Sequence, residues 1–578
     1  MTALSAGQPN VVELFRRRVA RHPEAPALRT FPEGRVLSWG EWARRSEAFA
    51  RRLRAEGVEP GDRVAIWAGS RPLWPIADLG ALMAGAVPVG LYPSSAPAQS
   101  RTLLADAGVV LAVADLGERV EFLRELTGVL PRLREVLDES EVDSPGLGES
   151  TGESPERWPG SGAGLGDDAL LIYTSGSTGE PKGARLSHRY LLASAASIRE
   201  ALGLREGDVT LSFLPYCHAA ERVFGLYTRI LTGIEAVLVE DHRRVWEAAR
   251  AHDPTVFGGL PRFFEKAVEG LREHAATGGD PAERVPHYFG RRLRVATSGG
   301  ATLDPEVSEA LEEVGVRVLG AYGLTEHLCA TMNRPERHDL ASAGPPMPGT
   351  ELRIATDGEI LLRRGPLTFS GYLNRPDETH RAFTPDGNWL LTGDLGRLDD
   401  AGFLHVTGRK KELLALSTGK KVAPLPIETR FVRDPWIAQA MLVGEGRKFV
   451  SALLVLNRSE VEDWAGSEGI EGDWEALVGH PRVLERVDRA VARVNRDLSR
   501  TEQVRRHHLL AEEWTVERGE LTPTLKVRRA VVAERHREAI EAIYAAAAPE
   551  APTSGSPESP ESSESSASAP APTNEETR

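Results

Sequence analysis

A glycine-rich loop directly after a buried strand constrains the fold of this chain most strongly. The apolar run Ala169–Ile172 predicts a buried strand, and a helical pattern follows from Tyr190 to Leu202. Between them lies Thr174-Ser175-Gly176-Ser177-Thr178-Gly179-Glu180-Pro181-Lys182. Glycines let backbone N–H groups approach an anion closely, hydroxyls add donors, and a lysine adds a positive charge for a phosphate oxygen. The loop therefore predicts a phosphate site at the end of a strand.

This loop differs from the Walker A sequence of P-loop proteins. Its lysine follows Gly179 by three residues with Pro181 between them, and no Ser or Thr follows Lys182. An ordinary polar surface turn is the alternative interpretation of any single Gly-rich loop. A surface turn needs no particular order of residues, whereas the twelve residues from Tyr173 to Ala184 have a specific order of Ser, Thr, Gly, Pro and Lys. This order favours the phosphate site over the turn.

Strand and helix patterns alternate before the loop. The sequence predicts strands at Arg63–Ala68, Pro88–Leu91 and Val109–Ala114, with helices at Ile76–Ala84 and Arg101–Ala107 between them. Such alternation is typical of a parallel sheet with helices on both faces. We therefore expect an α/β fold.

Length and composition predict more than one domain. A chain of 578 residues is too long for one hydrophobic core, and its 41% hydrophobic content is ordinary for a globular protein. Asp357-Gly358 between alternating runs predicts a hairpin in a β-rich subdomain. We expect a large N-terminal domain of parallel-rich sheets over 1–408 and a small, mobile α+β C-terminal domain over 409–547. Residues 548–578 are rich in Ser, Pro, Glu and Ala, and this composition predicts a disordered tail.

Charge and cysteine content narrow the function classes. A net charge of −14 argues against nucleic-acid binding, and two cysteines, Cys217 and Cys329, fit a reducing compartment. The N-terminus lacks a secretory signal, and the apolar run Leu79–Tyr92 is shorter than the roughly 20 residues of a spanning helix. We expect a cytoplasmic protein. Val11–His22 has the pattern of a basic amphipathic helix, which could make peripheral contact with a membrane surface. The oligomeric state, monomer or homodimer, does not follow from the sequence.

Two further predicted strands lead into glycine-containing segments. Leu293–Thr297 precedes Ser298-Gly299-Gly300-Ala301, and Val316–Leu319 precedes Gly320-Ala321-Tyr322-Gly323-Leu324-Thr325-Glu326. In open α/β sheets, ligands bind at the carboxyl ends of strands, where both segments fall.

Later motifs are individually weak. A Gly-Asp turn, a solvated basic run and an exposed lysine are each common without a function. These motifs are Thr392-Gly393-Asp394, Gly408-Arg409-Lys410-Lys411, Ser417-Thr418-Gly419-Lys420 and Thr522-Pro523-Thr524-Leu525-Lys526.

In this order, the motifs resemble those of the AMP-forming adenylate synthetases, which include acyl-CoA synthetases, peptide-synthetase adenylation domains and beetle luciferases. The resemblance spans about residues 11–545, and its late motifs look most like long-chain or bubblegum-type acyl-CoA synthetases. It implies that ATP and AMP contact Thr174, Ser175, Gly176, Ser177, Thr178, Gly179, Lys182, Gly300, Tyr322, Gly323, Thr325, Asp394, Arg409, Lys411 and Lys526.

The resemblance also implies roles within this set. Tyr322 would stack on adenine, while Asp394 and Arg409 would bind the ribose hydroxyls. Glu326, with Thr174, would hold Mg²⁺, for which hard oxygen ligands are suitable. The implied catalytic residues are Lys526, Lys182, Thr325 and Glu326.

The acyl and CoA region follows from the same resemblance. It would include His218, Gly299, Ser417, Gly419 and Lys420, with Lys410 as the pivot between domains. A histidine with a structural hydrogen bond is the alternative for His218. The absence of Asp near His218 favours an acyl substrate without an amine, although Glu221 leaves that choice open.

The expected activity is ATP-dependent conversion of a long-chain fatty acid to acyl-AMP and then to acyl-CoA, with Mg²⁺ as cofactor and ATP and CoA as co-substrates. An acyl-AMP ligase that loads a carrier protein or another acceptor has the same motifs. A non-catalytic acyl-binding or scaffolding protein is an alternative of a different class.

Overall fold

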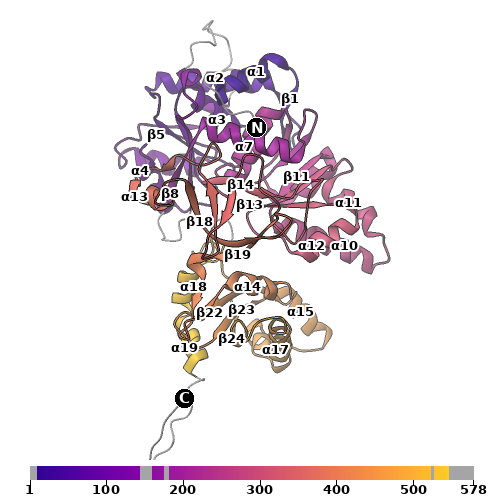
Figure 1. Ribbon diagram of the computed structural model, residues 1–578. Helices are drawn as coiled ribbons and strands as arrows, with labels where there is room; N and C mark the ends of the chain where they lie inside the picture. The colour runs from indigo at the N-terminus through magenta and orange to yellow at the C-terminus, as the bar shows by residue number, and fades with distance from the viewer. Residues whose placement is uncertain (1–8, 144–158, 175–180, 523–525, 546–578) are drawn as a thin grey trace, which may run out of the picture.

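The computed structural model describes residues 9–143, 159–174, 181–522 and 526–545. Figure 1 shows a large N-terminal domain of sheets and helices above a smaller C-terminal domain, which meets it below β18 and β19. This arrangement confirms the predicted α/β class with a large and a small domain. The predicted tail, 548–578, lies outside the described residues.

One large sheet carries the strand that precedes the glycine-rich loop. Its seven strands within the described residues are, in spatial order, β17 (Gly371–Tyr372), β8 (Lys182–Ser187), β7 (Asp168–Thr174), β4 (Val87–Gly90), β3 (Arg63–Trp67), β5 (Val109–Ala114) and β6 (Glu135–Asp138). The five strands from β7 to β6 pair in parallel, as the alternating pattern predicted. β8 instead runs antiparallel to β7. The sequence did not predict β8, because Lys, Gly and Ala have low strand propensity.

A second large sheet extends the domain on its other side. Its eight strands within the described chain are, in spatial order, β14 (His327–Met332), β13 (Val318–Leu324), β12 (Val295–Ser298), β11 (Val256–Gly259), β9 (Val209–Ser212), β10 (Glu235–Val239), β1 (Pro26–Phe31) and β2 (Val36–Ser38). β13 continues beyond the predicted end at Leu319, so Tyr322 and Gly323 lie on a strand. The chain then turns back into antiparallel β14. A Cβ at Gly323 would lie 2.4 Å from the Cys329 amide nitrogen, so this hairpin requires glycine there.

Helices cover and join these sheets. They are α1 (Val11–Arg21), α2 (Trp39–Ala55), α3 (Leu73–Met83), α4 (Pro97–Ala107), α5 (Gly117–Thr127), α6 (Glu139–Val142), α7 (His188–Leu202), the π-helix η4 (Ala220–Tyr227), α8 (Thr228–Thr232), α9 (Val245–His252), α10 (Pro261–Ala276), α11 (Pro281–Phe289), α12 (Pro305–Glu313) and α13 (Pro376–Arg381). Every residue of α3 is buried, as its nearly uniform hydrophobicity favours. α2 packs closely on α3 at Gly80, where a Cβ would lie 2.7 Å from the Phe49 ring.

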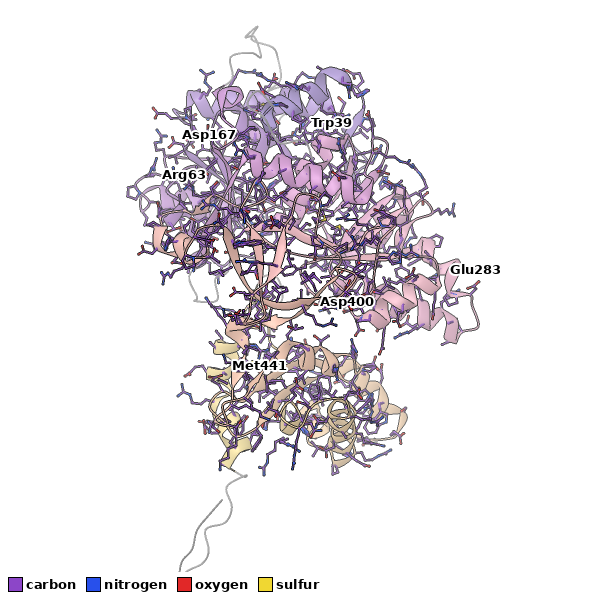
Figure 2. All side chains as sticks on the ribbon, in the orientation of Figure 1. Trp39, Arg63, Asp167, Glu283, Asp400 and Met441 are labelled. Atoms are coloured by element: carbon purple, nitrogen blue, oxygen red, sulfur yellow. The ribbon has the colours of Figure 1, made fainter. Side chains whose placement is uncertain are left out.

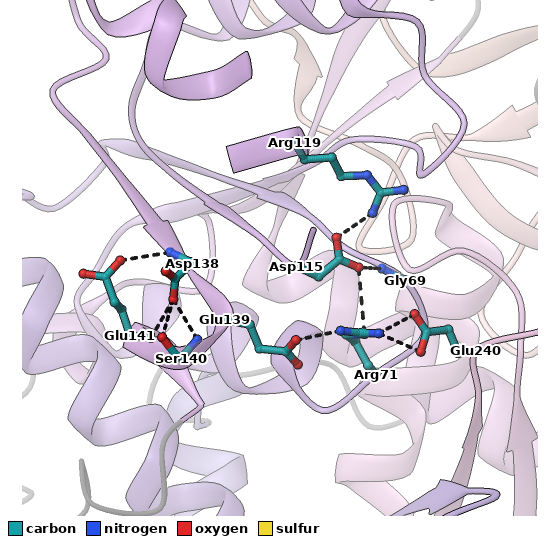
Figure 3. A network of polar contacts seen from close by, with 9 residues as sticks. All are labelled: Gly69, Arg71, Asp115, Arg119, Asp138, Glu139, Ser140, Glu141 and Glu240. Atoms are coloured by element: carbon teal, nitrogen blue, oxygen red, sulfur yellow. Dashed lines mark hydrogen bonds and ion pairs between the residues drawn. The ribbon is translucent and has the colours of Figure 1, made fainter. Parts of the chain in front are cut away.

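A network of charged residues joins the ends of the two large sheets (Figure 3). Arg71, shortly after β3, contacts Glu139 and Glu240 at 2.6 Å each, and its Nε lies 3.8 Å from Asp115. Asp115 follows β5 of one sheet, whereas Glu240 follows β10 of the other. Asp115 also accepts a 2.8 Å hydrogen bond from the Gly69 amide. One guanidinium therefore ties strand ends from both sheets together.

A four-stranded antiparallel sheet forms the lower part of the large domain. Its strands are β15 (Leu352–Ile354), β16 (Glu359–Arg363), β18 (Trp389–Leu398) and β19 (Leu404–Arg409). β15 and β16 pair antiparallel around Asp357-Gly358, which confirms the predicted hairpin. In Figure 2, Asp400 of the turn between β18 and β19 marks the lower rim of this domain.

The C-terminal domain has its own sheet and core, and Figure 2 labels Met441 on its strand β22. Its elements are the turn η6 (Lys410–Glu412), β20 (Leu414–Ala415), β21 (Lys421–Val422), α14 (Pro424–Val432), β22 (Ile437–Val443), β23 (Val450–Leu456), α15 (Arg458–Ser467), α16 (Trp474–Val478), α17 (Pro481–Asn495), β24 (Val504–Leu510), α18 (Arg529–Arg535) and α19 (Arg537–Ala545). Among the described residues, no helix has the length and apolar character to cross a bilayer.

Candidate active site

Two residues predicted for nucleotide binding contact the carboxylate of a third. Asp394 on β18 lies opposite Arg409 on β19, and the Arg409 Nε lies 3.1 Å from Asp394 Oδ1. The Tyr322 hydroxyl, on β13, donates a 2.8 Å hydrogen bond to Asp394 Oδ2. Asp394 is buried, so this pairing compensates much of the cost of burying its charge.

The backbone that carries Asp394 is held by hydrogen bonds at and just before this residue on β18. The Asp394 amide donates to the Thr392 hydroxyl at 3.1 Å, and the Gly393 amide donates to Glu359 Oε1 at 2.9 Å. Gly393 has φ of 72°, a left-handed conformation that favours glycine. Burial and the neighbouring Asp394 raise the pKa of Tyr322 well above its usual value, so its hydroxyl remains a donor.

Lys526 of the C-terminal domain is within electrostatic range of the same carboxylate. Burial lowers the pKa of Lys526 and nearby Arg409 lowers it further, while Asp394 and Glu412 act in the opposite direction. Lys526 therefore lies within electrostatic range of Asp394 although it keeps solvent exposure. Its amide donates a 3.0 Å hydrogen bond to the Thr522 hydroxyl. The structure thus brings together Tyr322, Asp394, Arg409 and Lys526.

His218 lies beside this group. It follows β9, and burial lowers its pKa to about 4, with the charge on Lys526 adding to the effect. Its Nδ1 accepts a 3.2 Å hydrogen bond from the Ala220 amide, so the neutral ring carries its proton on Nε2. The structural hydrogen bond considered as an alternative is present. The effect of the Lys526 charge shows that the ring is also within electrostatic range of Lys526.

A second group surrounds Lys182. This lysine lies opposite Thr174 across the β7–β8 pair, and the Thr174 hydroxyl is 3.5 Å from the Lys182 carbonyl oxygen. The Lys182 ammonium forms an ion pair with Glu378 of α13 and lies 5.6 Å from the centre of the Tyr372 ring. The Tyr372 hydroxyl donates a 2.5 Å hydrogen bond to Glu326 Oε1. Tyr372 therefore has the Lys182 ammonium near its ring and the Glu326 carboxylate at its hydroxyl.

The β13–β14 hairpin connects the two groups. Tyr322 lies on β13, and Thr325-Glu326 form the turn into β14. The buried Tyr190 hydroxyl donates to the Thr325 carbonyl at 2.9 Å and accepts from the Leu328 amide at 3.0 Å. The Phe369 amide donates to the Glu326 carbonyl at 2.9 Å. These bonds hold the turn between the groups around Asp394 and Lys182.

Other predicted residues lie at the border or elsewhere. Gly299 and Gly300 follow β12, with Gly300 in a left-handed conformation at φ of 82°. A Cβ on Gly299 would meet no atom closer than Ala321 Cβ at 3.9 Å. Lys411 is exposed in η6, between the domains. The loop residues Ser175, Gly176, Ser177, Thr178 and Gly179 lie outside the described residues.

The second predicted loop of the C-terminal domain does not join this cluster. Ser417, Gly419 and Lys420 are exposed, and their polar contacts are made within the C-terminal domain. The Ser417 amide donates to the Arg447 carbonyl at 2.9 Å, and Lys420 Nζ lies 3.2 Å from the Thr501 hydroxyl. In this orientation of the C-terminal domain, Lys526 is within electrostatic range of Asp394, whereas the polar contacts of this loop stay within its own domain.

Sequence reasoning missed Tyr190, Tyr372 and Glu378. Pro376 followed by Asp377 and Glu378 is typical of a helix start and could have indicated α13. No pattern in the sequence links that helix to Lys182, because the contact forms only when β17 pairs with β8.

Comparison with known proteins gives two family matches. A model described as "AMP-binding enzyme" matches residues 15–373, and one described as "AMP-binding enzyme C-terminal domain" matches residues 411–548. The chain is 34% identical over 557 residues to the long-chain-fatty-acid–CoA ligase FadD15 of Mycobacterium bovis, covering 87% of this chain and 92% of that protein. It is 28% identical to the long-chain-fatty-acid–CoA ligase ACSBG1 of Rattus norvegicus, covering 84% and 78%.

Solved structures agree in fold. ATP-bound MatB from Rhodopseudomonas palustris superposes with a TM-score of 0.73 at 22% identity, covering 92% of this chain and 99% of that one. The adenylation domain of a carboxylate reductase from Mycobacterium chelonae gives a TM-score of 0.75 at 24% identity, covering 94% and 92%.

Proposed function

Because the chain belongs to the AMP-binding enzymes, we propose that it activates a long-chain fatty acid with ATP and transfers the acyl group to CoA. This membership confirms the resemblance inferred from the motifs. The relatives named as long-chain-fatty-acid–CoA ligases support the substrate class. The observation that supports the proposal within the structure is the contact of Tyr322 and Arg409 with Asp394, with Lys526 of the C-terminal domain in electrostatic range of the same carboxylate.

In the first step, a carboxylate oxygen of the fatty acid bonds to the α-phosphorus of ATP. The bond from this phosphorus to the bridging oxygen breaks, and pyrophosphate leaves. The carboxylate is already a competent nucleophile, so the protein supplies orientation and charge neutralisation. Lys526 is proposed to neutralise charge on the carboxylate and the α-phosphate, and Lys182 to bind a phosphate oxygen in place of its ion pair with Glu378. Asp394 accepts the ribose hydroxyls, with Tyr322 stacked on the adenine.

Mg²⁺ fits the oxygen donors on the Lys182 side. Glu326 is a partly buried carboxylate with one oxygen bonded to Tyr372, and its other oxygen is a hard ligand of the kind Mg²⁺ prefers beside phosphates. Glu326 and the Thr174 hydroxyl would hold the ion. When bound, it would neutralise phosphate charge. Tyr372 orients the Glu326 carboxylate through its hydroxyl. The hydrogen bond from the Phe369 amide holds the Glu326 backbone in the β13–β14 turn.

In the second step, the sulfur of CoA, its proton released to solvent, attacks the acyl carbonyl. A carbon–sulfur bond forms, the bond to the phosphate oxygen breaks, and AMP leaves. The loop containing Ser417, Gly419 and Lys420 is proposed to face the site in this step. Since this loop makes its polar contacts within the C-terminal domain here, we propose that the domain rotates about Lys410 between the two steps. The ion pairs of Lys410 with Asp357 and Glu359, at 2.6 and 2.7 Å, anchor that pivot to the large domain.

The test is AMP release by the full chain with ATP, Mg²⁺ and saturated carboxylates of increasing length, with and without CoA. We expect sustained, CoA-dependent AMP release that rises with chain length into the long-chain range. Acyl-AMP formation without any CoA-dependent turnover would instead indicate an acyl-AMP ligase. Absence of ATP binding in calorimetry would refute an enzymatic role altogether.

A further inference from the structure

An ion pair outside the cluster described above joins the two domains. Arg433, the residue that ends α14 in the C-terminal domain, pairs through Nε with Asp304 Oδ2 in the large domain. The Asp304 side chain is 13% exposed and that of Arg433 is 36% exposed. Figure 1 shows α14 at the top of the C-terminal domain and α12 at the lower edge of the large domain.

Asp304 is rigidly placed on the large domain. It is the N-cap of α12, and its Oδ1 accepts a 2.9 Å hydrogen bond from the Glu306 amide. The other carboxylate oxygen is the one that meets Arg433. Asp304 also ends the segment that begins with Gly299 and Gly300 after β12, so its position is tied to the predicted site.

Arg433 is connected to Lys526 through the C-terminal domain. α14 carries Glu428, a buried carboxylate that forms an ion pair with Arg529 and accepts a 2.5 Å hydrogen bond from the Leu442 amide. Arg529 begins α18, three residues after Lys526, and it also donates to the Leu442 carbonyl at 3.2 Å. Glu428 therefore holds α14 against the start of α18, three residues after Lys526.

We propose that Asp304 and Arg433 are positioning residues, whose ion pair holds the C-terminal domain in the orientation that presents Lys526 to the acyl-AMP-forming site. This inference rests on the proposed function. The pair must break when the domain rotates to bring the Ser417–Lys420 loop inward, because Asp304 stays with the large domain and α14 moves. It therefore favours the first half-reaction over the second.

The structure suggests variants that separate this role from folding. Asp304→Asn keeps an oxygen that can cap α12, because asparagine is as good an N-cap as aspartate, but removes the charge. Arg433→Gln removes the cation with little loss of side-chain length. Arg482→Gln is the matched control, since Arg482 forms a 2.9 Å ion pair with Glu468 wholly within the C-terminal domain.

The two half-reactions are measured separately, as pyrophosphate exchange and as acyl-CoA formation from supplied acyl-AMP. Each single variant is expected to slow acyl-AMP formation about two- to five-fold, the range for a partly exposed ion pair, without slowing thioester formation. The double variant should show no further loss, because both substitutions break one contact. Equal losses in both half-reactions, additive losses in the double variant, or the same profile for Arg482→Gln would overturn the proposal.

Domain orientation provides a readout independent of activity. Cys217 and Cys329 are both buried, so spin labels can be directed to cysteines introduced at the exposed positions Glu309 on α12 and Glu485 on α17. Double electron–electron resonance should show one dominant distance in the otherwise native chain and a second population in Asp304→Asn. An unchanged distribution would overturn the proposal. If the native enzyme released no AMP with any fatty acid, the proposed function would fail while this measurement still tested the ion pair.

Discussion

Removing the Tyr322 hydroxyl should weaken ATP binding while leaving the aromatic ring in place. In Tyr322→Phe, the buried Asp394 loses the 2.8 Å hydrogen bond at Oδ2 and keeps Arg409 at Oδ1. A hydrogen bond to a charged group contributes about 1.5–3 kcal/mol, and each ~1.4 kcal/mol is a factor of ten in affinity. Since Arg409 remains, the lower end applies, and KM for ATP should rise about ten-fold.

The pH dependence of this effect follows from the pKa of Tyr322. Its pKa is raised well above the ordinary value, so the hydroxyl keeps its proton and donates throughout the range in which the enzyme is assayed. The ratio of KM values between Tyr322→Phe and the unmodified chain should therefore be constant from about pH 6 to 9. A ratio that changes across that range would show that the phenol titrates and is not a fixed donor.

Tyr372→Phe is the matched control, because it also removes a tyrosine hydroxyl from a carboxylate of the same site. The lost bond, 2.5 Å to Glu326 Oε1, lies on the proposed Mg²⁺ side. The assay is initial AMP release at varied ATP and Mg²⁺ in the presence of CoA. We expect Tyr372→Phe to raise the Mg²⁺ concentration needed for half-maximal rate and Tyr322→Phe to raise KM for ATP at saturating Mg²⁺. Identical profiles, or an unchanged KM in Tyr322→Phe, would refute the assignment of the two carboxylates.

Three further outcomes follow from buried and mobile charges. Lys526→Ala should abolish acyl-AMP formation, by about 100-fold or more, and spare thioester formation from supplied acyl-AMP; equal loss of both would contradict its assignment. Asp78→Asn, which leaves the fully buried Arg222 without its carboxylate, should lower the urea unfolding free energy of the large domain by about 3–5 kcal/mol. The double variant Asp78→Leu/Arg222→Met should lose much less than that, and a larger loss would argue against charge as the cause. For His218, the pKa of about 4 lies below its unfolded value, so protonation favours unfolding and stability should fall as pH drops from about 6.5 to 4; His218→Gln should reduce that slope in urea melts at pH 7 and 5.

The parallel core was predictable because buried strands and amphipathic helices leave strong patterns. β5 begins and ends where the sequence predicted, at Val109 and Ala114. An uninterrupted apolar run of this length is typical of a strand that is buried on both faces of a parallel sheet. β8 and the continuation of β13 were not predictable by the same reasoning. Their residues include Gly, Lys and Ala, which have low strand propensity, so no strand pattern stands out in the sequence.

Within the site, motif residues were predictable, but their supporting residues were not. Tyr322, Asp394 and Arg409 each stood in a recognisable motif, and the structure places them in contact. Tyr372 and Glu378 complete the surroundings of Lys182 from a distant part of the chain. Such contacts depend on strand order and helix placement, which the local residue pattern of the chain does not reveal.

The arrangement around Asp394 also explains why two domains are needed for one reaction. Its carboxylate lies on the large domain, and Arg409 is the last residue of β19, where the chain passes into the C-terminal domain. Lys526 belongs to the C-terminal domain. A nucleotide bound at Asp394 would therefore contact groups from both sides of the pivot, so its binding must favour the orientation that assembles them. The Asp304–Arg433 ion pair is proposed to favour the same domain orientation. Nucleotide binding should therefore stabilise this ion pair, and the ion pair should strengthen nucleotide binding, because the two equilibria are linked.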